Sequence, residues 1–222
     1  MPDQFDVIVL NRVRKQPKNY IKLAKERGVK IVLDLDDWIE WPEWHLNRDG
    51  FDTPIIEAEI KNMIELADVI WCGSEYLMNS LKNEKAIYIP NAIDFEQPQF
   101  QPQPQEKKGY TIGYVAGANH HLDCERLFKP LDILRQKNKD YNILVGGVAK
   151  YAISSDYWNY ILNIFTSNGL LPKERLFKIE SLDPYNYAVQ YNYVDCLLAP
   201  LNNDQYSRCK SNIKVLEAGA FG

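Results

Sequence analysis

The last fourteen residues of the chain combine residue types that could bind a phosphorylated ligand. Lys210, Lys214 and Glu217 lie in the segment CKSNIKVLEAGAFG, which follows an apolar run ending at Pro200 and a polar loop. A strand that feeds a loop and then a helix start, with lysines nearby, is typical of a phosphate site. We expect Lys210 and Lys214, four residues apart, to share one face of a helix over 211–220. The alternative is an exposed ion pair between a lysine and Glu217.

In the phosphate interpretation each of these residue types has a role. The Glu217 carboxylate can accept hydrogen bonds from ribose hydroxyls, and the two lysines and the helix-start N–H groups can neutralise a diphosphate leaving group. The segment therefore favours a nucleotide-linked substrate.

Asp36, Asp37 and Trp38 form a second group of candidate residues, in the run DLDDW after a predicted strand. Clustered carboxylates could bind a hard cation, hydrogen-bond a polyhydroxylated ligand, or cap the next segment. We favour polar contacts to an acceptor or between domains over a metal site. The nearby Trp41, Trp44 and His45 could stack on a sugar ring or be buried in a domain interface.

A third group follows the first predicted strand of the second half, in the run GYVAGANHH. Gly117 at a strand-to-loop turn would let the backbone approach a pyrophosphate. The GxGxxG pattern of dinucleotide-binding folds is absent. His120 could contact a phosphate or sugar, although a polar loop is the alternative, and no Cys, Asp or Glu at suitable spacing completes a zinc site.

Strands and helices alternate along both halves of the chain. This pattern predicts an α/β fold with two Rossmann-like, doubly wound parallel sheets, whose ligands bind beyond the carboxyl ends of the strands. We expect strands at 5–10, 30–35, 69–72, 86–89, 110–115, 142–145, 176–179 and 194–198, and helices at 19–27, 54–67, 73–81, 123–137, 156–168, 184–191 and 211–220.

A run rich in proline and glutamine, residues 97–105, separates the two halves. Such a composition predicts an extended, poorly packed linker. We therefore expect an N-terminal acceptor-side domain at 1–94, a linker at 95–109 and a C-terminal donor-binding domain at 110–222.

Composition excludes several classes of protein. The net charge of −4 argues against a nucleic-acid partner. No apolar run approaches the roughly 20 residues of a membrane span, and the opening residues lack the features of a signal peptide. The four cysteines have no CxxC spacing. They are interpreted as reduced thiols of a cytoplasmic protein, with neither a disulfide framework nor a bound metal.

Taken in order, the motifs resemble those of GT-B glycosyltransferases of the retaining "group 1", family 4-like type. The final segment, together with VDCLLAPL before it, is similar to that family's donor-site segment. Residues 30–37 and 67–77, and the run IPNAID at 89–94, are also similar to the family.

The resemblance implies an enzyme that transfers a sugar from a nucleoside-diphosphate sugar to a glycan, lipid-linked or protein acceptor, without a metal or cofactor. By that likeness Glu217 holds the ribose, and Ser211 and Asn212 face the sugar and diphosphate. Lys210, Lys214 or His120 would replace the Arg/Lys pair that grips the diphosphate.

The chain also departs from the family. Cys209 stands where the family has the first of two glutamates. Both domains are shorter than in the family, and we expect a partner chain to complete the C-terminal domain. The alternative function is a non-catalytic GT-B-like binding or assembly module. A sugar-phosphate epimerase is a third possibility, but no acid/base pair is identifiable.

Overall fold

The computed structural model describes residues 4–11, 18–45, 48, 53–103, 105–137, 140–149, 155–166 and 171–222. The chain divides into two compact units. The first unit is Met1–Asn91 with Asn203–Asn212, and the second is Ala92–Asn202 with Ile213–Gly222. The chain therefore returns to the first unit for ten residues, whereas the sequence prediction assigned all of 110–222 to one domain.

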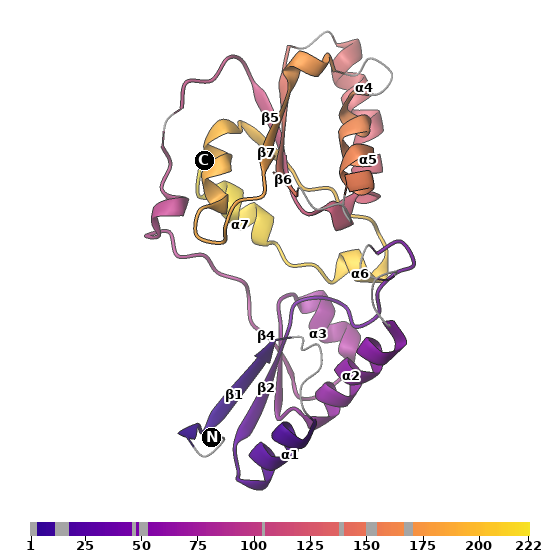
Figure 1. The fold of residues 1–222 in the computed structure, drawn as a ribbon, viewed down its shortest axis with the longest axis vertical. Helices are drawn as coiled ribbons and strands as arrows, with labels where there is room; N and C mark the ends of the chain where they lie inside the picture. The colour runs from indigo at the N-terminus through magenta and orange to yellow at the C-terminus, as the bar shows by residue number, and fades with distance from the viewer. Residues whose placement is uncertain are drawn as a thin grey trace. The chain divides into compact units, whose positions relative to one another are not determined.

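The first unit is built on a parallel sheet of strand order β1-β2-β3-β4 (Figure 1). The predicted bounds of its second and third strands are confirmed. Its elements are β1 (Val7–Asn11), α1 (Lys18–Glu26), β2 (Lys30–Leu35), α2 (Thr53–Leu66), β3 (Val69–Cys72), α3 (Glu75–Leu81), β4 (Ala86–Tyr88) and α6 (Gln205–Arg208).

Alternate residues of these strands form the core of the first unit. Ile31, Leu33 and Leu35 of β2 are at most 1% exposed and pack in one cluster with residues of α1, α2 and α3. Because successive strand residues point to opposite faces, all three helices cover one face of this sheet. On the other face Val7 and Val9 are half exposed.

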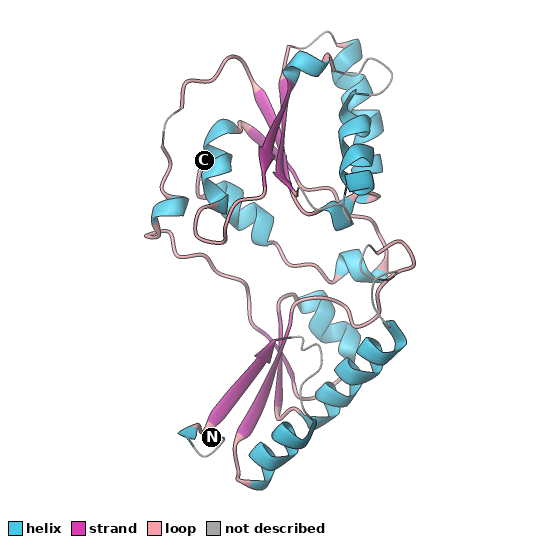
Figure 2. Cartoon of the chain, in the orientation of Figure 1, coloured by secondary structure: helices cyan, strands magenta, loops and turns pink. Residues whose placement is uncertain are grey.

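The second unit is built on a parallel sheet, whose strands are magenta in Figure 2, and the strand order is β7-β6-β5-β8. Its strands are β5 (Thr111–Val115), β6 (Asn142–Val148), β7 (Leu176–Glu180) and β8 (Cys196–Leu198). Its α-helices are α4 (Phe128–Gln136), α5 (Ser155–Thr166) and α7 (Ile213–Gly219), and its 3₁₀ helices are η2 (Pro98–Phe100), η3 (Ala118–His120), η4 (Asp123–Leu127), η7 (Lys173–Arg175) and η8 (Tyr187–Tyr193).

Both faces of the second sheet are covered by helices and by the segment that contains η8. Helices α4 and α5 lie side by side over one face (Figure 1). On the other face the segment that contains η8 lies so close that a Cβ on Gly113 would overlap Val194, and one on Gly146 would overlap Gln190. Helix α7 reaches the same face through a cluster that joins Val115 to Tyr191 and residues 218–221.

The prediction of a poorly packed linker agrees with the exposure of residues 97, 98 and 101–103 but not with η2. Within the linker, η2 buries Gln99 and Phe100, which are 7% and 5% exposed. Gln99 Nε2 donates to the carbonyl oxygen of Pro184 at 3.2 Å, and the Phe100 ring meets the Tyr187 ring edge-on. One aromatic residue in an otherwise polar run is enough to dock this segment on the second unit.

No helix in the described ranges is long and apolar enough to cross a membrane.

Candidate functional site

The carboxyl ends of the strands in the first unit are covered by the unit's own returning segment, Asn203–Asn212. Ser74, after β3, donates from Oγ to the carbonyl oxygen of Cys209 at 2.7 Å. Asn91, after β4, donates from Nδ2 to Ser211 Oγ at 2.5 Å. Ser74 also caps α3, since its Oγ accepts from Leu77 N at 3.1 Å. The edge at which parallel sheets bind ligands is thus occupied here by residues 209–211.

Tyr206 is the centre of the polar contacts in this region. Its hydroxyl donates to Asp37 Oδ2 at 3.0 Å and lies 3.0 Å from His45 Nε2. Lys210 Nζ donates to the same hydroxyl oxygen at 3.3 Å. Since the hydroxyl has one proton, and Asp37 receives it, the His45 contact requires that Nε2 carry a hydrogen. Tyr206 is 4% exposed, and Trp44 packs edge-on against its ring.

Lys210, a predicted diphosphate ligand, forms an ion pair with Asp37, a predicted acceptor-side residue. Lys210 Nζ lies 2.5 Å from Asp37 Oδ1 and 4.5 Å from the centroid of the Tyr206 ring. The two side chains are 19% and 17% exposed. An anionic ligand at Lys210 must therefore compete with the Asp37 carboxylate.

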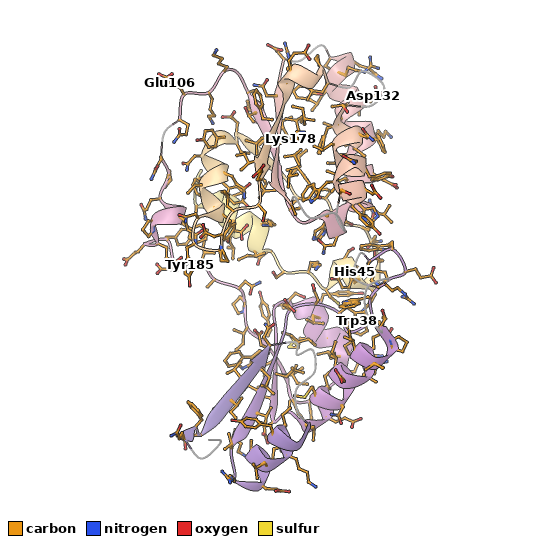
Figure 3. The ribbon with its side chains drawn as sticks, in the orientation of Figure 1. Trp38, His45, Glu106, Asp132, Lys178 and Tyr185 are labelled. Atoms are coloured by element: carbon orange, nitrogen blue, oxygen red, sulfur yellow. The ribbon has the colours of Figure 1, made fainter. Side chains whose placement is uncertain are left out.

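Trp38 and His45 both lie on the chain that follows β2 (Figure 3). Trp38 packs against the core of the first unit, and His45 stacks on Trp41 with ring centroids 5.1 Å apart. His45 is 4% exposed. The aromatic cluster of the sequence analysis is therefore largely internal to the first unit.

Cys209 is part of the hydrophobic core of the first unit and is fully buried. Burial, followed by the nearby Asp37 carboxylate, raises the pKa of its thiol to about 11. At neutral pH this group is an uncharged apolar side chain. It cannot supply the negative charge of the glutamate that the resemblance expects at this position.

Glu217 is a buried carboxylate of the second unit, at 3% exposure. Tyr187 and Tyr191 donate from their hydroxyls to Glu217 Oε1 and Oε2, each at 2.6 Å. Lys214 Nζ lies 2.9 Å from Oε2. Tyr187 and Tyr191 lie one helical turn apart, and both belong to η8. A compact, charge-assisted network therefore fixes Glu217 on α7.

The prediction that Lys210 and Lys214 share a helix face is wrong. Helix α7 begins at Ile213, so Lys214 is helical and Lys210 is not. The contacts of Cys209 and Ser211 to the first unit hold the chain out of helical geometry up to that point. Lys214 instead pairs with Glu217, as in the alternative weighed from the sequence, but the pair is not on an exposed face because the Glu217 side chain is 4% exposed.

Gly117 and His120 lie in the loop after β5, at the carboxyl edge of the second sheet. His120 Nδ1 lies 2.7 Å from Asp123 Oδ2, and Asn202 N donates to Asp123 Oδ1 at 2.7 Å. Asp123 is fully buried. Its carboxylate thus ties this loop to the chain after β8 and leaves His120 Nε2 as the ring nitrogen directed away from that bond.

The neighbouring His121 has a different environment. It is 8% exposed, and its ring meets the rings of Tyr157 and Tyr160 edge-on. Burial lowers the pKa of His121, so this imidazole is neutral at pH 7. Among the described residues, no group of three His, Cys, Asp or Glu side chains could hold a metal ion.

The structure pairs four of the predicted site residues. Asp37 and Lys210 are paired in the first unit, and Lys214 and Glu217 are paired in the second. Ser211 instead contacts Asn91, and Gly117 and His120 lie in the loop after β5. Sequence reasoning missed Tyr206 and Asp123, which organise their neighbours. It did not select Tyr187 and Tyr191 either. Their spacing of four residues indicates that the two tyrosines could lie on one side of a helix. It does not indicate that they bind Glu217.

No protein-family model and no curated protein matches the chain. Solved structures do match it in fold. They include an alpha,alpha-trehalose-phosphate synthase (UDP-forming) from Burkholderia vietnamiensis, with a TM-score of 0.60, 8% identity, and coverage of 100% of this chain and 57% of that one.

A glycosyltransferase from Rickettsia africae ESF-5 gives a TM-score of 0.59 at 13% identity and covers 99% and 56% of the two chains. An alpha-glucosyltransferase in complex with UDP gives a TM-score of 0.54 at 12% identity. The match covers 98% of this chain and 60% of that one. The predicted α/β fold of two Rossmann-like parallel sheets, as in GT-B glycosyltransferases, is confirmed. The chain spans little more than half the length of these structures.

Proposed function

We propose that the protein is a glycosyltransferase that moves a sugar from a nucleoside-diphosphate sugar to an acceptor, without a bound metal and with retention at the anomeric carbon. The observation that carries the proposal is the likeness in fold to sugar-transfer enzymes over 98–100% of this chain. A likeness that runs through both units is more specific than one to a single Rossmann-like sheet, because single sheets of this kind serve many functions.

In this proposal the second unit binds the nucleotide. The Glu217 carboxylate accepts hydrogen bonds from the ribose hydroxyls, and Lys214 offers its charge to the diphosphate. Both Glu217 oxygens already accept tyrosine hydroxyls. Ribose binding therefore requires that the Tyr187 hydroxyl, the less buried of the two, give way or share the oxygen.

Gly117 and His120 are the further donor-side residues, in the loop at the carboxyl edge of the second sheet. His120 is oriented by Asp123 at 2.7 Å, so its Nε2 can donate to a phosphate when the ring is protonated. In the first unit we propose Asp36, Asp37 and Trp38 for the acceptor, and Lys210, Ser211 and Asn212 for the diphosphate and donor sugar. Release of Lys210 from Asp37 is a condition of that role.

A non-catalytic binding or assembly module is the second candidate. It is favoured by Cys209, a buried thiol in place of a carboxylate, and by the internal bonding of Lys210 and Glu217. A domain whose ligand-binding side chains satisfy one another can keep the fold without turnover.

An assay of nucleoside-diphosphate release separates the two candidates. The purified chain is incubated with UDP-, GDP- and ADP-sugars, with and without a mixture of glycan and lipid-linked acceptors. We expect transfer or slow hydrolysis of one donor. We expect Lys214→Gln to lower the rate of nucleoside-diphosphate release at least tenfold. Exposed Lys129→Gln on α4 is the matched control. Binding of a nucleotide without any turnover would support the module instead.

A further inference from the structure

The second unit contains a cavity of about 660 Å³ on the sheet face opposite α4 and α5. Its floor includes Thr111 and Asn142, the first residues of β5 and β6, with Leu144, Phe177 and Ile179 beside them. It therefore begins at the amino ends of β5 and β6 and extends along β7 to Leu182, which follows that strand. The loop of Gly117 and His120 lies at the carboxyl edge of the same sheet.

The crossover between β7 and β8 lies on the same face of the sheet. Val194 and Gln190 of this crossover contact the sheet closely at Gly113 and Gly146. Residues 106–108 close one side. Lys107 Nζ lies 2.5 Å from Asp195 Oδ1, and Asn142 Nδ2 donates to the carbonyl oxygen of Lys108 at 2.6 Å. The walls are thus held in place without a ligand.

Most of the surface that lines the cavity is apolar, and its aliphatic members are Leu144, Ile179, Leu182 and Val189. Two of its polar side chains each donate one amide N–H inside the protein. Asn142 Nδ2 donates to Lys108, and Gln190 Nε2 donates to the carbonyl oxygen of Tyr187 at 2.7 Å. An alkyl chain can occupy the apolar part of such a pocket without hydrogen bonds to its lining.

The rim of the cavity is positively charged, although the whole chain carries a net charge of −4. Three lysines and one glutamate belong to the lining. Lys107 is paired with Asp195. Within the described part of the chain, Lys108 and Lys178 have no carboxylate partner within 4.0 Å. Lys178 and Glu106 can be followed in Figure 3, on β7 and on the segment before β5.

We propose that this cavity binds an amphipathic anion, namely a single aliphatic chain that carries a phosphate or carboxylate group. The chain occupies the aliphatic floor, and Lys108 and Lys178 bind the anionic group. The volume lies within the range of about 300–1,000 Å³ that is usual for small-molecule sites. The proposal does not depend on glycosyl transfer, because none of the residues that line the cavity is assigned to the donor.

Titration calorimetry with simple probes tests the proposal. Decyl phosphate and decanoate, each below its micellar concentration, supply the two head groups, and decyl glucoside supplies the same chain without charge. We expect at least one of the anions to bind about tenfold or more tighter than the glucoside, which corresponds to about 1.4 kcal/mol. Equal affinity for the glucoside, or for inorganic phosphate alone, would overturn the proposal.

Substitutions in the cavity test whether the decyl probes bind there. Lys108→Gln/Lys178→Gln is expected to abolish the preference for the anion, and Phe177→Ser, at a side chain that is 49% exposed, is expected to weaken all three decyl probes. Lys129→Gln and Ile133→Ser are the matched controls on α4, where Ile133 is 42% exposed. The proposal is wrong if the cavity variants bind like the controls while their urea unfolding midpoints match the wild type.

Discussion

Glu217 shows how a buried charge is stabilised at a single residue. A carboxylate at 3% exposure is costly unless hydrogen bonds replace its hydration. Burial, followed by the Glu217 carboxylate, raises the pKa of both Tyr187 and Tyr191. Their hydroxyls therefore stay protonated at neutral pH and remain donors. Lys214 adds the opposite charge.

Removing one of these donors should cost stability. Tyr191→Phe leaves Glu217 Oε2 without its tyrosine hydroxyl in a buried site, and we expect a loss of about 1–3 kcal/mol in the free energy of unfolding. Urea denaturation measures it. Tyr185→Phe, at a side chain that is 83% exposed, should change stability by less than about 0.5 kcal/mol. Equal effects of the two substitutions would contradict the network.

The candidate residues could be predicted from their types, but their partners could not. Asp37 and Lys210 were both selected from the sequence, yet their ion pair joins residues 173 positions apart and depends on the returning segment. Tyr206 carried no local signal, because its role arises from Asp37 and His45, which are distant in sequence. Residue type indicates possible chemistry, whereas tertiary structure decides which groups are already paired.

At the scale of elements, the strands were the most predictable. The apolar runs at 30–35 and 69–72 match β2 and β3 residue for residue, because each strand carries buried apolar residues that also mark it in the sequence. The predicted helix at 184–191 is instead the 3₁₀ helix η8, whose position is set by close packing against Gly146. Such packing is not visible in a local pattern.

The docked linker gives a prediction at this scale. Phe100 is 5% exposed and packs with Ala188 and Tyr191, so Phe100→Ala should destabilise the second unit by about 3 kcal/mol. Thermal or urea unfolding measures the change. Phe95→Ala, at a side chain that is 55% exposed, is the matched control. If the two substitutions cost the same, the linker is not docked through Phe100.

Asp68, which precedes β3, is bonded to β2 in the first unit. This contact makes the free energy of unfolding of the first unit depend on pH. Asp68 Oδ2 accepts from Ile31 N at 2.8 Å, and Lys25 and Lys30 lie 3.7 and 3.8 Å from Oδ1. The bond from Ile31 is the main cause that lowers the pKa of Asp68; the two lysines add to it against the opposing effect of burial.

The pKa of Asp68 in the folded state lies below its unfolded value of about 3.9. The stabilisation by the Asp68 carboxylate is therefore fully present at pH values above about 3.9. It is lost as the pH falls through the lower, folded-state pKa. Asp68→Asn should therefore lower stability at pH 7 and flatten the dependence of the unfolding free energy on pH below about 5. Parallel pH profiles for wild type and variant would show that Asp68 is not the group responsible.

At the scale of the whole molecule, the chain leaves the second unit at Asn203 and rejoins it at Ile213. The intervening segment is held on the first unit mainly through Tyr206, whose hydroxyl contacts Asp37, His45 and Lys210. The sequence placed the domain boundary by composition alone, and composition does not reveal that a short segment returns.

The anchoring of this segment can be measured by hydrogen exchange. Tyr206→Phe removes the shared hydroxyl, and we expect faster amide exchange within residues 203–212 while α4 and α5 keep their protection. Tyr88→Phe, at a side chain that is 37% exposed, is the matched control. Unchanged exchange in the Tyr206 variant would mean that other contacts, such as Ser74 to Cys209, suffice.

The affinity for nucleoside diphosphates tests the central claim most directly. Titration calorimetry of UDP, GDP and ADP with the wild type should reveal binding of one of them. Glu217→Gln, which preserves the shape of the side chain, should weaken that binding about tenfold or more, because a charge-assisted bond to the ribose is lost. Tyr185→Phe should leave it unchanged. Absence of binding by all three nucleotides, or equal affinity in a folded Glu217→Gln variant, would contradict the assignment of the second unit as a nucleotide-sugar site.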